Sequence, residues 1–284
     1  MELKYKVLKK NTITSIVKDK MNISGRLFLK LKKNNKIMLN DVPVKAYSEA
    51  NIGDIVSLDL DFVEDNNNIV SNENIQFNIL YEDEWILIVD KPSGIPVHPS
   101  MNCYENSLSN GIKAYYESKN FHFKIRPVNR LDKNTSGIVI FAKSEYIQEN
   151  LKSYLKEYIA IVDGVLEGNG KIDVPIARKN ESIIERCVSD SGNKAITYYE
   201  VIKNFENFTL VKCRLETGRT HQIRVHMKYL GHPLLGDTLY GTSSKLINRQ
   251  ALHAYHIKFN HPVTNKEIDI YANIPEDINR IINY

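Results

Sequence analysis

One carboxylate of this chain lies in a setting suited to chemistry: Asp132 follows Arg130 closely and precedes Lys133 directly. An aspartate that is ionised at neutral pH can act as a nucleophile or as a proton acceptor. A neighbouring arginine stabilises this ionised form and orients it. An isolated aspartate among turn-forming residues is more often only a turn residue, so a chemical role needs support from the rest of the sequence.

The segment around Asp132 predicts a loop that leads into a buried strand. Pro127 fixes its own backbone and disfavours helix at Arg126, and residues 134–137 are the turn-forming run Asn-Thr-Ser-Gly. Residues 138–143 are apolar on nearly both faces, which is typical of a strand inside a sheet. We therefore expect Asp132 on a loop that runs into the core.

A second segment, residues 215–237, predicts a helix that can direct an arginine inward. Thr220 suits the N-cap of this helix, and Gly231 suits its C-terminal end. Arg224 lies beside the apolar stripe of the helix and can reach the interior. The stripe has helical spacing and consists of Ile223, Met227 and Leu230.

The histidines and cysteines do not predict a metal site or a disulfide framework. His221 and His226 would point roughly 140° apart on a helix of about 3.6 residues per turn, and no carboxylate or cysteine completes a ligand set. The three cysteines are scattered and form no C-x-x-C pair. No run approaches the roughly 18 apolar residues of a membrane span, so we expect a cytoplasmic protein without a membrane partner.

Two further segments predict strands next to polar side chains. Residues 85–89 form a short apolar run, after which Lys91-Pro92-Ser93-Gly94 turns the chain. Lys91 can be a phosphate contact or a solvated turn residue. Residues 156–164 read as a strand with a glycine stop, and this pattern alone makes Tyr158 a half-buried aromatic residue.

The N-terminal part is strongly basic, with twelve Lys or Arg against three Asp or Glu before residue 46, whereas the whole chain has a net charge of +4. This asymmetry predicts a polyanion-binding module joined to a different domain. Two short helices, a strand–turn–strand unit and a further strand are expected in it. The predicted parts are a small domain at 1–64, a polar linker at 65–77 and a second domain at 78–284.

Four segments of the second domain resemble, in the expected order, motifs of the RluA/RluD family of RNA pseudouridine synthases. The Asp132 segment is similar to the motif H-R-L-D-x-x-T-S-G, with Asn129 in place of the histidine. Residues 156–164 resemble K-x-Y-x-A-x-V-x-G, residues 215–226 resemble L-x-T-G-R-T-H-Q-I-R-V-H, and residues 79–99 resemble the family's first motif. Residues 1–64 resemble the alpha-L RNA-binding domain.

This resemblance implies roles for individual residues. It makes Asp132 the essential catalytic residue, pairs Arg224 with it, and puts Tyr158 beside the target base as a further member of the catalytic set. It implies neither a metal nor a cofactor. Asn129 can bind the loop by hydrogen bonds but lacks the ionisable ring of a histidine. The residues implied on the substrate side are Arg130, Leu131, Arg219, His221, Leu252 and Lys91.

The implied reaction is the isomerisation of uridine to pseudouridine in RNA. It breaks the bond from the ribose to N1 of uracil, turns the base and rejoins it through C5. The base must leave its stack, at a cost of about a few kcal/mol. Stacking on an aromatic ring returns roughly 1–3 kcal/mol, which we assign to Tyr158. Loops of ribosomal or transfer RNA are the expected substrates, because their bases can be splayed out.

The expected fold class is α+β, because strands outnumber helices in the second domain. The family implies a mixed, mainly antiparallel central sheet with an active-site cleft, preceded by the small α/β RNA-binding module, and we expect a monomer. Two other classes of function stay open. One is a non-catalytic RNA-binding protein. The other is a glycoside or nucleoside hydrolase that pairs Asp132 with Asp237 or Glu216, since such enzymes generally use two carboxylates.

Overall fold

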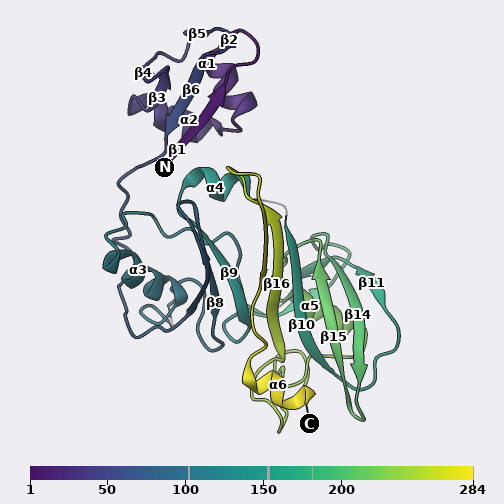
Figure 1. Cartoon of the computed structure of the whole chain (residues 1–284). Helices are drawn as coiled ribbons and strands as arrows, with labels where there is room; N and C mark the ends of the chain where they lie inside the picture. The colour runs from purple at the N-terminus through teal and green to yellow at the C-terminus, as the bar shows by residue number, and fades with distance from the viewer. Residues whose placement is uncertain (102, 152–153, 181, 284) are drawn as a thin grey trace.

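The computed structural model describes residues 1–101, 103–151, 154–180 and 182–283. A small N-terminal domain lies at one end of a larger domain that is built on one long sheet (Figure 1). Strands predominate over helices in the larger domain, and most neighbouring strands run antiparallel, so the predicted α+β fold is confirmed. None of the helices in these ranges has the length and apolar composition needed to cross a membrane.

The N-terminal domain packs short helices against a small antiparallel sheet. Ser24 caps the second α-helix, because its Oγ accepts a hydrogen bond from the backbone N–H of Leu27 at 3.2 Å. Asn40 and Asp41, both at positive φ, form the predicted turn between two strands. In chain order the elements are β1 (Glu2–Lys6), β2 (Asn11–Thr12), α1 (Ile13–Ser15), a π-helix (Ile16–Lys20), α2 (Gly25–Lys33), β3 (Ile37–Leu39), β4 (Val42–Pro43), β5 (Glu49–Ala50) and β6 (Ile55–Asp59).

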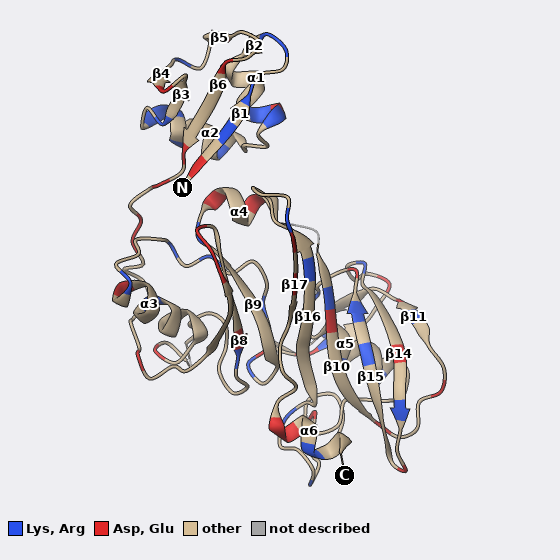
Figure 2. Cartoon of the chain, in the orientation of Figure 1, with Lys and Arg blue, Asp and Glu red and all other residues tan. Residues whose placement is uncertain are grey.

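Ion pairs join the N-terminal domain to helix α4 (Glu145–Asn150) of the larger domain. The Arg26 guanidinium in α2 lies 2.7 Å from Glu145 and 3.4 Å from Glu149. Ser24 donates a hydrogen bond to Glu149 at 2.9 Å. Figure 2 shows acidic residues on α4, which lies at the end of the larger domain next to the N-terminal domain. Some basic residues of α2 therefore form ion pairs with carboxylates of the same chain.

The larger domain is organised around a nine-stranded sheet within the described residues. Strand β16 runs parallel to β9 and antiparallel to β10 and β17. Across the sheet the strands are β11 (Gly170–Asp173), β14 (Ile196–Asn204), β15 (Phe208–Leu215), β10 (Leu155–Asp163), β16 (Leu252–Asn260), β9 (Ser136–Ala142), β8 (Ile86–Lys91) and β7 (Asn78–Glu82), with β17 (Glu267–Tyr271) beside β16. Strands β12 (Ile176–Arg178) and β13 (Arg186–Val188) form a separate hairpin.

Strand β9 carries the loop of Asp132 into the core, as its sequence predicts. All of its residues are buried, and successive side chains enter two apolar clusters on opposite faces of the sheet. Gly137 permits the close parallel contact with β16: its φ is +114°, and a Cβ there would lie 2.2 Å from the carbonyl oxygen of Ala254. Any other residue would push the two strands apart.

Helices cover the sheet near the Asp132 loop. Helix α5 (Gln222–Tyr229) packs on the Val139 face through Ile223 and Met227, as the apolar stripe predicts. Helix α3 (Leu108–Ser118) lies on the same face and was not predicted from the sequence. Helix α6 (Glu276–Ile282), the last helix before the C-terminus, packs in a separate apolar cluster (Figure 1). The sheet and α5 together fix where Asp132 and Arg224 lie.

Candidate active site

A cleft of about 910 Å³ opens over the sheet beside the Asp132 loop. Its walls come from the loop after β8, the Asp132 loop, β10, the start of α5 and the start of β16. Every site residue predicted from the sequence lines this cleft except Lys91. The residues brought together are Asp132, Tyr158, Arg224, Arg130, Leu131, Arg219, His221 and Leu252.

The backbone that follows Asp132 is fixed by residues far away in the sequence. Asp132 itself accepts a backbone hydrogen bond from Thr135 at 3.1 Å, which closes the turn. Bonds from distant residues to the turn are Lys91 Nζ to Lys133 O (3.2 Å), Gly94 N to Lys133 O (2.9 Å), Arg249 Nη1 to Asn134 O (3.2 Å) and Gln250 Nε2 to Thr135 Oγ1 (3.2 Å). Because these bonds fix the backbone of the turn, they limit the positions that the Asp132 side chain can take.

Arg224 contacts Asp132, as expected, and its Nη1 donates to Asp132 Oδ2 at 3.0 Å. On its other edge, Arg224 binds Asp237 through Nε at 2.7 Å and Nη2 at 2.8 Å. Burial opposes the charge of Arg224, but the hydrogen bonds and charge of Asp237, with those of Asp132, raise its pKa. Arg224 is therefore a fixed cation with one N–H group directed at Asp132.

Asp132 differs from Asp237 in its access to the cleft. The Asp132 side chain is 26% exposed, whereas Arg224 is 8% and Asp237 is 1% exposed. No protein group in the described part of the chain donates a hydrogen bond to Asp132 Oδ1. One oxygen of this carboxylate is thus bound to the protein and the other is open to a ligand, which suits a nucleophile or a proton acceptor.

Tyr158 and two leucines form an apolar wall beside this carboxylate. Tyr158 lies on β10 opposite Cys213 and Ala254, and the side chain is buried with its ring against the cleft. Burial raises the pKa of Tyr158, and the nearby Tyr154 and the charge of Asp132 raise it further, so the phenol keeps its proton. Leu131 and Leu252 are also buried at the cleft and complete a surface suited to a flat base.

His221 lies between Asp132 and Tyr240. Its Nε2 is 3.8 Å from Asp132 Oδ2, and its Nδ1 is 2.8 Å from the Tyr240 hydroxyl. Burial lowers the pKa of His221, which favours the neutral ring. His221, at φ 57°, is the N-cap of α5, so the prediction of Thr220 as the N-cap was one residue early. The reason is the left-handed turn at His221, which no periodicity reveals.

Arg130 and Arg219 lie at the rim of the cleft and are exposed. Arg219 is oriented by its Nε, which donates to the carbonyl of Lys194 at 2.9 Å. Asn129 takes the role expected for an amide: its Nδ2 donates to Ile138 O at 2.9 Å, and its Oδ1 accepts from Ile140 N at 2.8 Å. The amide therefore ties the loop to the first part of β9.

The position of Lys91 agrees with neither interpretation of the sequence, a phosphate contact or a solvated turn residue. Its side chain is fully buried, and its Nζ donates to the carbonyls of Pro92 (2.8 Å), Ile95 (2.8 Å) and Lys133 (3.2 Å). Burial, together with the charge of Arg249, lowers its pKa to about 7. Lys91 is thus neither a solvated turn residue nor open to a phosphate; it supports the Asp132 turn from behind. The sequence did not predict this because a lysine beside Pro and Gly usually lies on the surface.

Three residues hold this site in place in roles that the sequence did not predict. Asp237 binds Arg224, Tyr240 binds His221, and Arg249 binds the Asp132 turn. Asp277 in α6 anchors Arg249 at 2.7 and 2.9 Å. A signal for the first two existed in the sequence, because Gly236 and Gly241 bracket them and indicate a tight turn.

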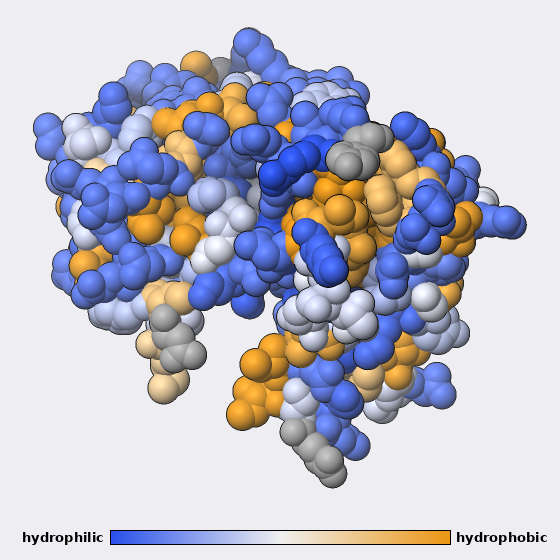
Figure 3. All heavy atoms as spheres, turned by 90° about the horizontal axis from the view of Figure 1, so that it is seen from below, coloured by the Kyte–Doolittle hydropathy of each residue, from blue (hydrophilic) through white to orange (hydrophobic). Residues whose placement is uncertain are grey.

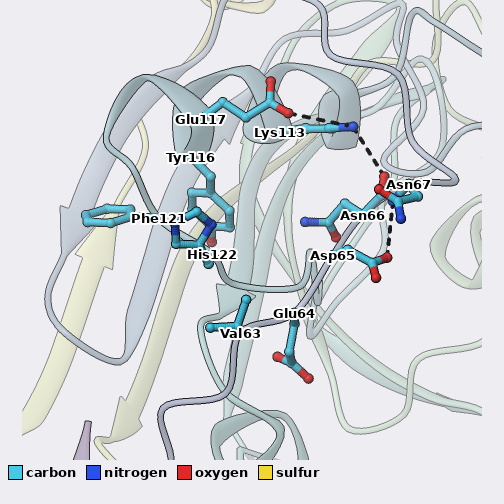
Figure 4. Close-up of a pocket in the computed structure, with 10 residues that line it drawn as sticks. All are labelled: Val63, Glu64, Asp65, Asn66, Asn67, Lys113, Tyr116, Glu117, Phe121 and His122. Atoms are coloured by element: carbon cyan, nitrogen blue, oxygen red, sulfur yellow. Dashed lines mark hydrogen bonds and ion pairs between the residues drawn. The ribbon is translucent and has the colours of Figure 1, made fainter.

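The described residues contain no cluster of His, Cys, Asp and Glu with the geometry of a metal site. A smaller hollow of about 300 Å³ lies elsewhere, between residues 63–67, where the N-terminal domain meets the linker, and α3 with the segment that follows it (Figure 4). Lys113 lines it and donates to the carbonyl of Asn66 at 3.3 Å. None of its lining residues belongs to the cleft that contains Asp132.

Residues 85–229 match the model of a protein family described as RNA pseudouridylate synthase. The fold agrees: Human RNA Pseudouridylate Synthase Domain Containing 4 superposes with a TM-score of 0.59 at 20% identity, covering 72% of this chain and 92% of that one. Human RNA Pseudouridylate Synthase Domain Containing 1 gives a TM-score of 0.58 at 22% identity, covering 70% and 84%. The fold and the family match define an RNA pseudouridine synthase.

Similar sequences show to which family of RNA pseudouridine synthases this chain belongs. "Uncharacterized RNA pseudouridine synthase YjbO" of Bacillus subtilis is 42% identical over 217 residues, which is 74% of this chain and 77% of YjbO. "Ribosomal large subunit pseudouridine synthase D" of Vibrio cholerae is 36% identical over 264 residues, covering 86% and 81%. The same-named protein of Zymomonas mobilis is 40% identical over 227 residues, covering 72% of each chain. This chain belongs to the RluA/RluD family of RNA pseudouridine synthases, enzymes that isomerise uridine in RNA.

Proposed function

We propose that this enzyme converts specific uridines of structured RNA to pseudouridine through Asp132, acting as nucleophile or base on a flipped-out uridine. The observation that carries the proposal is the asymmetric setting of the Asp132 carboxylate. Arg224 binds its Oδ2 at 3.0 Å, no described protein group donates to its Oδ1, and the side chain, 26% exposed, lines a cleft of about 910 Å³. A fixed cation behind an open carboxylate orients it toward a ligand.

The cleft offers a complete setting for an extruded base. Tyr158 supplies a ring on which uracil stacks, which returns about 1–3 kcal/mol of the cost of unstacking. Leu131 and Leu252 exclude water from the other sides of the base. Arg130 and Arg219 at the rim contact RNA phosphates or fill the space that the uridine leaves. His221 faces the junction of ribose and base. Pseudouridine formation needs no metal or redox cofactor.

Two loops beside the cleft provide further RNA contacts. Met101 is fully exposed in the loop after Ser100, and Ile183 (85% exposed) and Ile184 (63% exposed) lie between β12 and β13. Ser100 and Ile184 also line the cleft. The face seen in Figure 3 is deeply notched, with apolar residues on the projections at both sides of the notch. Exposed apolar side chains of this kind pack against unstacked bases.

Residues 1–64 act in this proposal as an alpha-L RNA-binding domain, joined by the linker 65–77 to the catalytic domain 78–284. Lys32 and Lys33 on α2 are exposed, and Figure 2 shows basic residues gathered on the helices of the N-terminal domain. Their charge attracts RNA without reading its sequence. Ribosomal RNA is the favoured substrate, because several similar proteins are named for the large ribosomal subunit, and transfer RNA is the second candidate. We expect a monomer in the cytoplasm.

The geometry argues against the hydrolase alternative. Asp237 is 1% exposed and has both oxygens bound to Arg224, so it does not face a sugar across the cleft from Asp132. Glu216 accepts a hydrogen bond from Tyr198 at 2.9 Å and does not line the cleft. A protein that only binds RNA would form no pseudouridine, so detection of this product distinguishes the proposed enzyme from a non-catalytic RNA-binding protein.

The experiment maps pseudouridine in total RNA of cells that lack this gene and carry wild type, Asp132→Asn or no copy. We expect sites that disappear in the deletion and return only with wild type, which would also name the substrate. Purified Asp132→Asn should bind the same RNA about as tightly and form no product. Sites restored by Asp132→Asn would refute the role of Asp132, and release of free uracil would favour hydrolysis.

A further inference from the structure

The Tyr240 hydroxyl connects the β12–β13 hairpin to the active-site cleft. It accepts a hydrogen bond from the backbone N–H of Arg186 in β13 at 2.8 Å, and it lies 2.8 Å from Nδ1 of His221. Tyr240 is only 4% exposed, so water does not replace these partners easily. The edge of one ring meets the face of the other, with centroids 5.5 Å apart.

The partners of this hydroxyl determine which way its proton points. A phenol has one proton to donate, and the Arg186 N–H already occupies its oxygen as a donor. In the described part of the chain, His221 Nδ1 is the acceptor that is left for the Tyr240 proton. Nδ1 therefore accepts, and a neutral His221 carries its proton on Nε2. Nε2 is the nitrogen that faces Asp132 Oδ2, at 3.8 Å.

We propose that Tyr240 is a positioning residue that fixes His221 as the Nε2–H tautomer, so that the ring presents a hydrogen-bond donor to the cleft beside Asp132. The catalytic consequence rests on the proposed function of Asp132, whereas the tautomer itself does not. The opposite tautomer would turn a lone pair toward a carboxylate, which is repulsive. With Nε2–H in place, His221 can donate to Asp132 or to an oxygen of the ribose or uracil.

The surroundings favour this state. Burial lowers the pKa of His221 and so keeps the ring neutral. The other charges around the ring, Asp132, Arg224, Arg186 and Asp237, have opposing signs. Burial also raises the pKa of Tyr240, so the hydroxyl retains the proton that it donates. A tautomer set by a neutral hydrogen bond is therefore the stable arrangement near neutral pH.

One turn, residues 237–240, thus controls both partners of Asp132. At its start, Asp237 binds Arg224 through two N–H groups, and at its end Tyr240 binds His221. The turn is closed by Asp237 Oδ1, which accepts from the backbone N–H of Leu239 at 3.1 Å. The Arg224 guanidinium also lies over the Tyr240 ring, 4.9 Å from its centroid. Substituting Tyr240 by Phe keeps this ring and removes only the hydroxyl.

The first test is nitrogen-15 NMR of the full-length protein without RNA. In the wild type we expect His221 to have a protonated Nε2 and an unprotonated Nδ1 at neutral pH. In Tyr240→Phe the Nδ1 loses its donor, so the Nε2–H form should become a mixture with the Nδ1–H form. The control is Tyr198→Phe, which removes a hydroxyl bonded to Glu216 outside the cleft, and it should leave the His221 signals unchanged.

The second test separates positioning from mere packing. Glutamine can put an amide N–H near the place of Nε2, whereas asparagine can replace only Nδ1, so His221→Gln should retain more activity than His221→Asn. For Tyr240→Phe we expect kcat to fall about tenfold with KM nearly unchanged, as for the loss of one well-placed hydrogen bond. Equal activity of the two His221 variants would overturn the catalytic part of the proposal.

Failure of the tautomer proposal can be distinguished from failure of the proposed function of Asp132. A wild-type His221 with its proton on Nδ1, or a tautomer that Tyr240→Phe does not alter, would overturn the proposal even if Asp132 is essential. If Asp132→Asn remains active, the proposed function fails while the NMR result for the tautomer still stands. Thermal unfolding of each variant checks that the fold is intact, and the His221 variants provide the answer if Tyr240→Phe does not fold.

Discussion

Arg224 and Asp237 form a bidentate ion pair, with Nε–Oδ2 and Nη2–Oδ1 distances of 2.7 and 2.8 Å. Both side chains are almost completely buried, so the pair is not screened by water. The remaining Nη1 of Arg224 is directed at Asp132 at 3.0 Å. The open carboxylate of the cleft is therefore oriented by a cation that a second, hidden carboxylate holds in place.

Asp237→Asn should reduce both activity and stability, although Asp237 does not face the cleft. An amide cannot accept two charge-assisted bonds, so Arg224 becomes a poorly paired buried charge, which costs about 3 kcal/mol of unfolding free energy. A shifted Arg224 orients Asp132 less well, and we expect kcat to fall by roughly 10- to 100-fold. Urea unfolding and single-turnover kinetics measure the two effects. Asp163→Asn, an exposed carboxyl at the end of β10, is the control and should change neither.

The ring and the hydroxyl of Tyr158 should contribute separately, the ring to RNA binding and the hydroxyl to kcat. Tyr158→Phe keeps the stacking surface, so RNA affinity should stay within about twofold, and any loss of kcat measures the hydroxyl. Tyr158→Ala removes the surface as well and should weaken binding of the flipped uridine by about 1–3 kcal/mol. Binding is measured with an RNA that carries an unreactive uridine analogue. Equal effects of the two substitutions on binding would contradict the stacking role.

Ionisation of Asp90 should lower the free energy of unfolding as the pH rises. Burial raises its pKa from 3.8 to about 6, an effect that the neighbouring Lys91 partly offsets. A raised pKa in the folded state means that the stabilising protonated form is present below about pH 4 and is lost as the pH rises through 6. Asp90→Asn should therefore stabilise the protein at neutral pH and have little effect at pH 4. Chemical unfolding at both pH values tests this, with exposed Asp190→Asn as a control.

The exposed lysines of α2 should bind RNA electrostatically. Replacing Lys32 and Lys33 by Ala should weaken binding of many RNA sequences alike and reduce the slope of log K against log salt by about 1.5. Arg26→Ala is the matched control on the same helix, because Arg26 already pairs with Glu145 at 2.7 Å. A slope that falls as much for Arg26→Ala would show that the contact with α4 gives way when RNA binds.

Local sequence patterns predicted which segments around Asp132 are strands and which of their faces are buried. Residues 138–142 are apolar on both faces, and both faces are buried in β9. The stripe of α5 likewise predicted that Arg224 could reach inward, where it meets Asp132. These features follow from local periodicity, since the spacing of apolar side chains states which side of an element faces the core. Motif resemblance added the family, which the comparisons confirm.

The contacts that orient the site could be found only from the folded chain. The sequence does not show that Lys91 lies buried against the carbonyl of Lys133, or that Asp237 is withdrawn from the cleft by Arg224. It also does not reveal the left-handed turn that brings His221 between Asp132 and Tyr240. Hydrogen bonds between distant residues depend on the path of the whole chain, and a polar side chain has no periodicity that reports its partner.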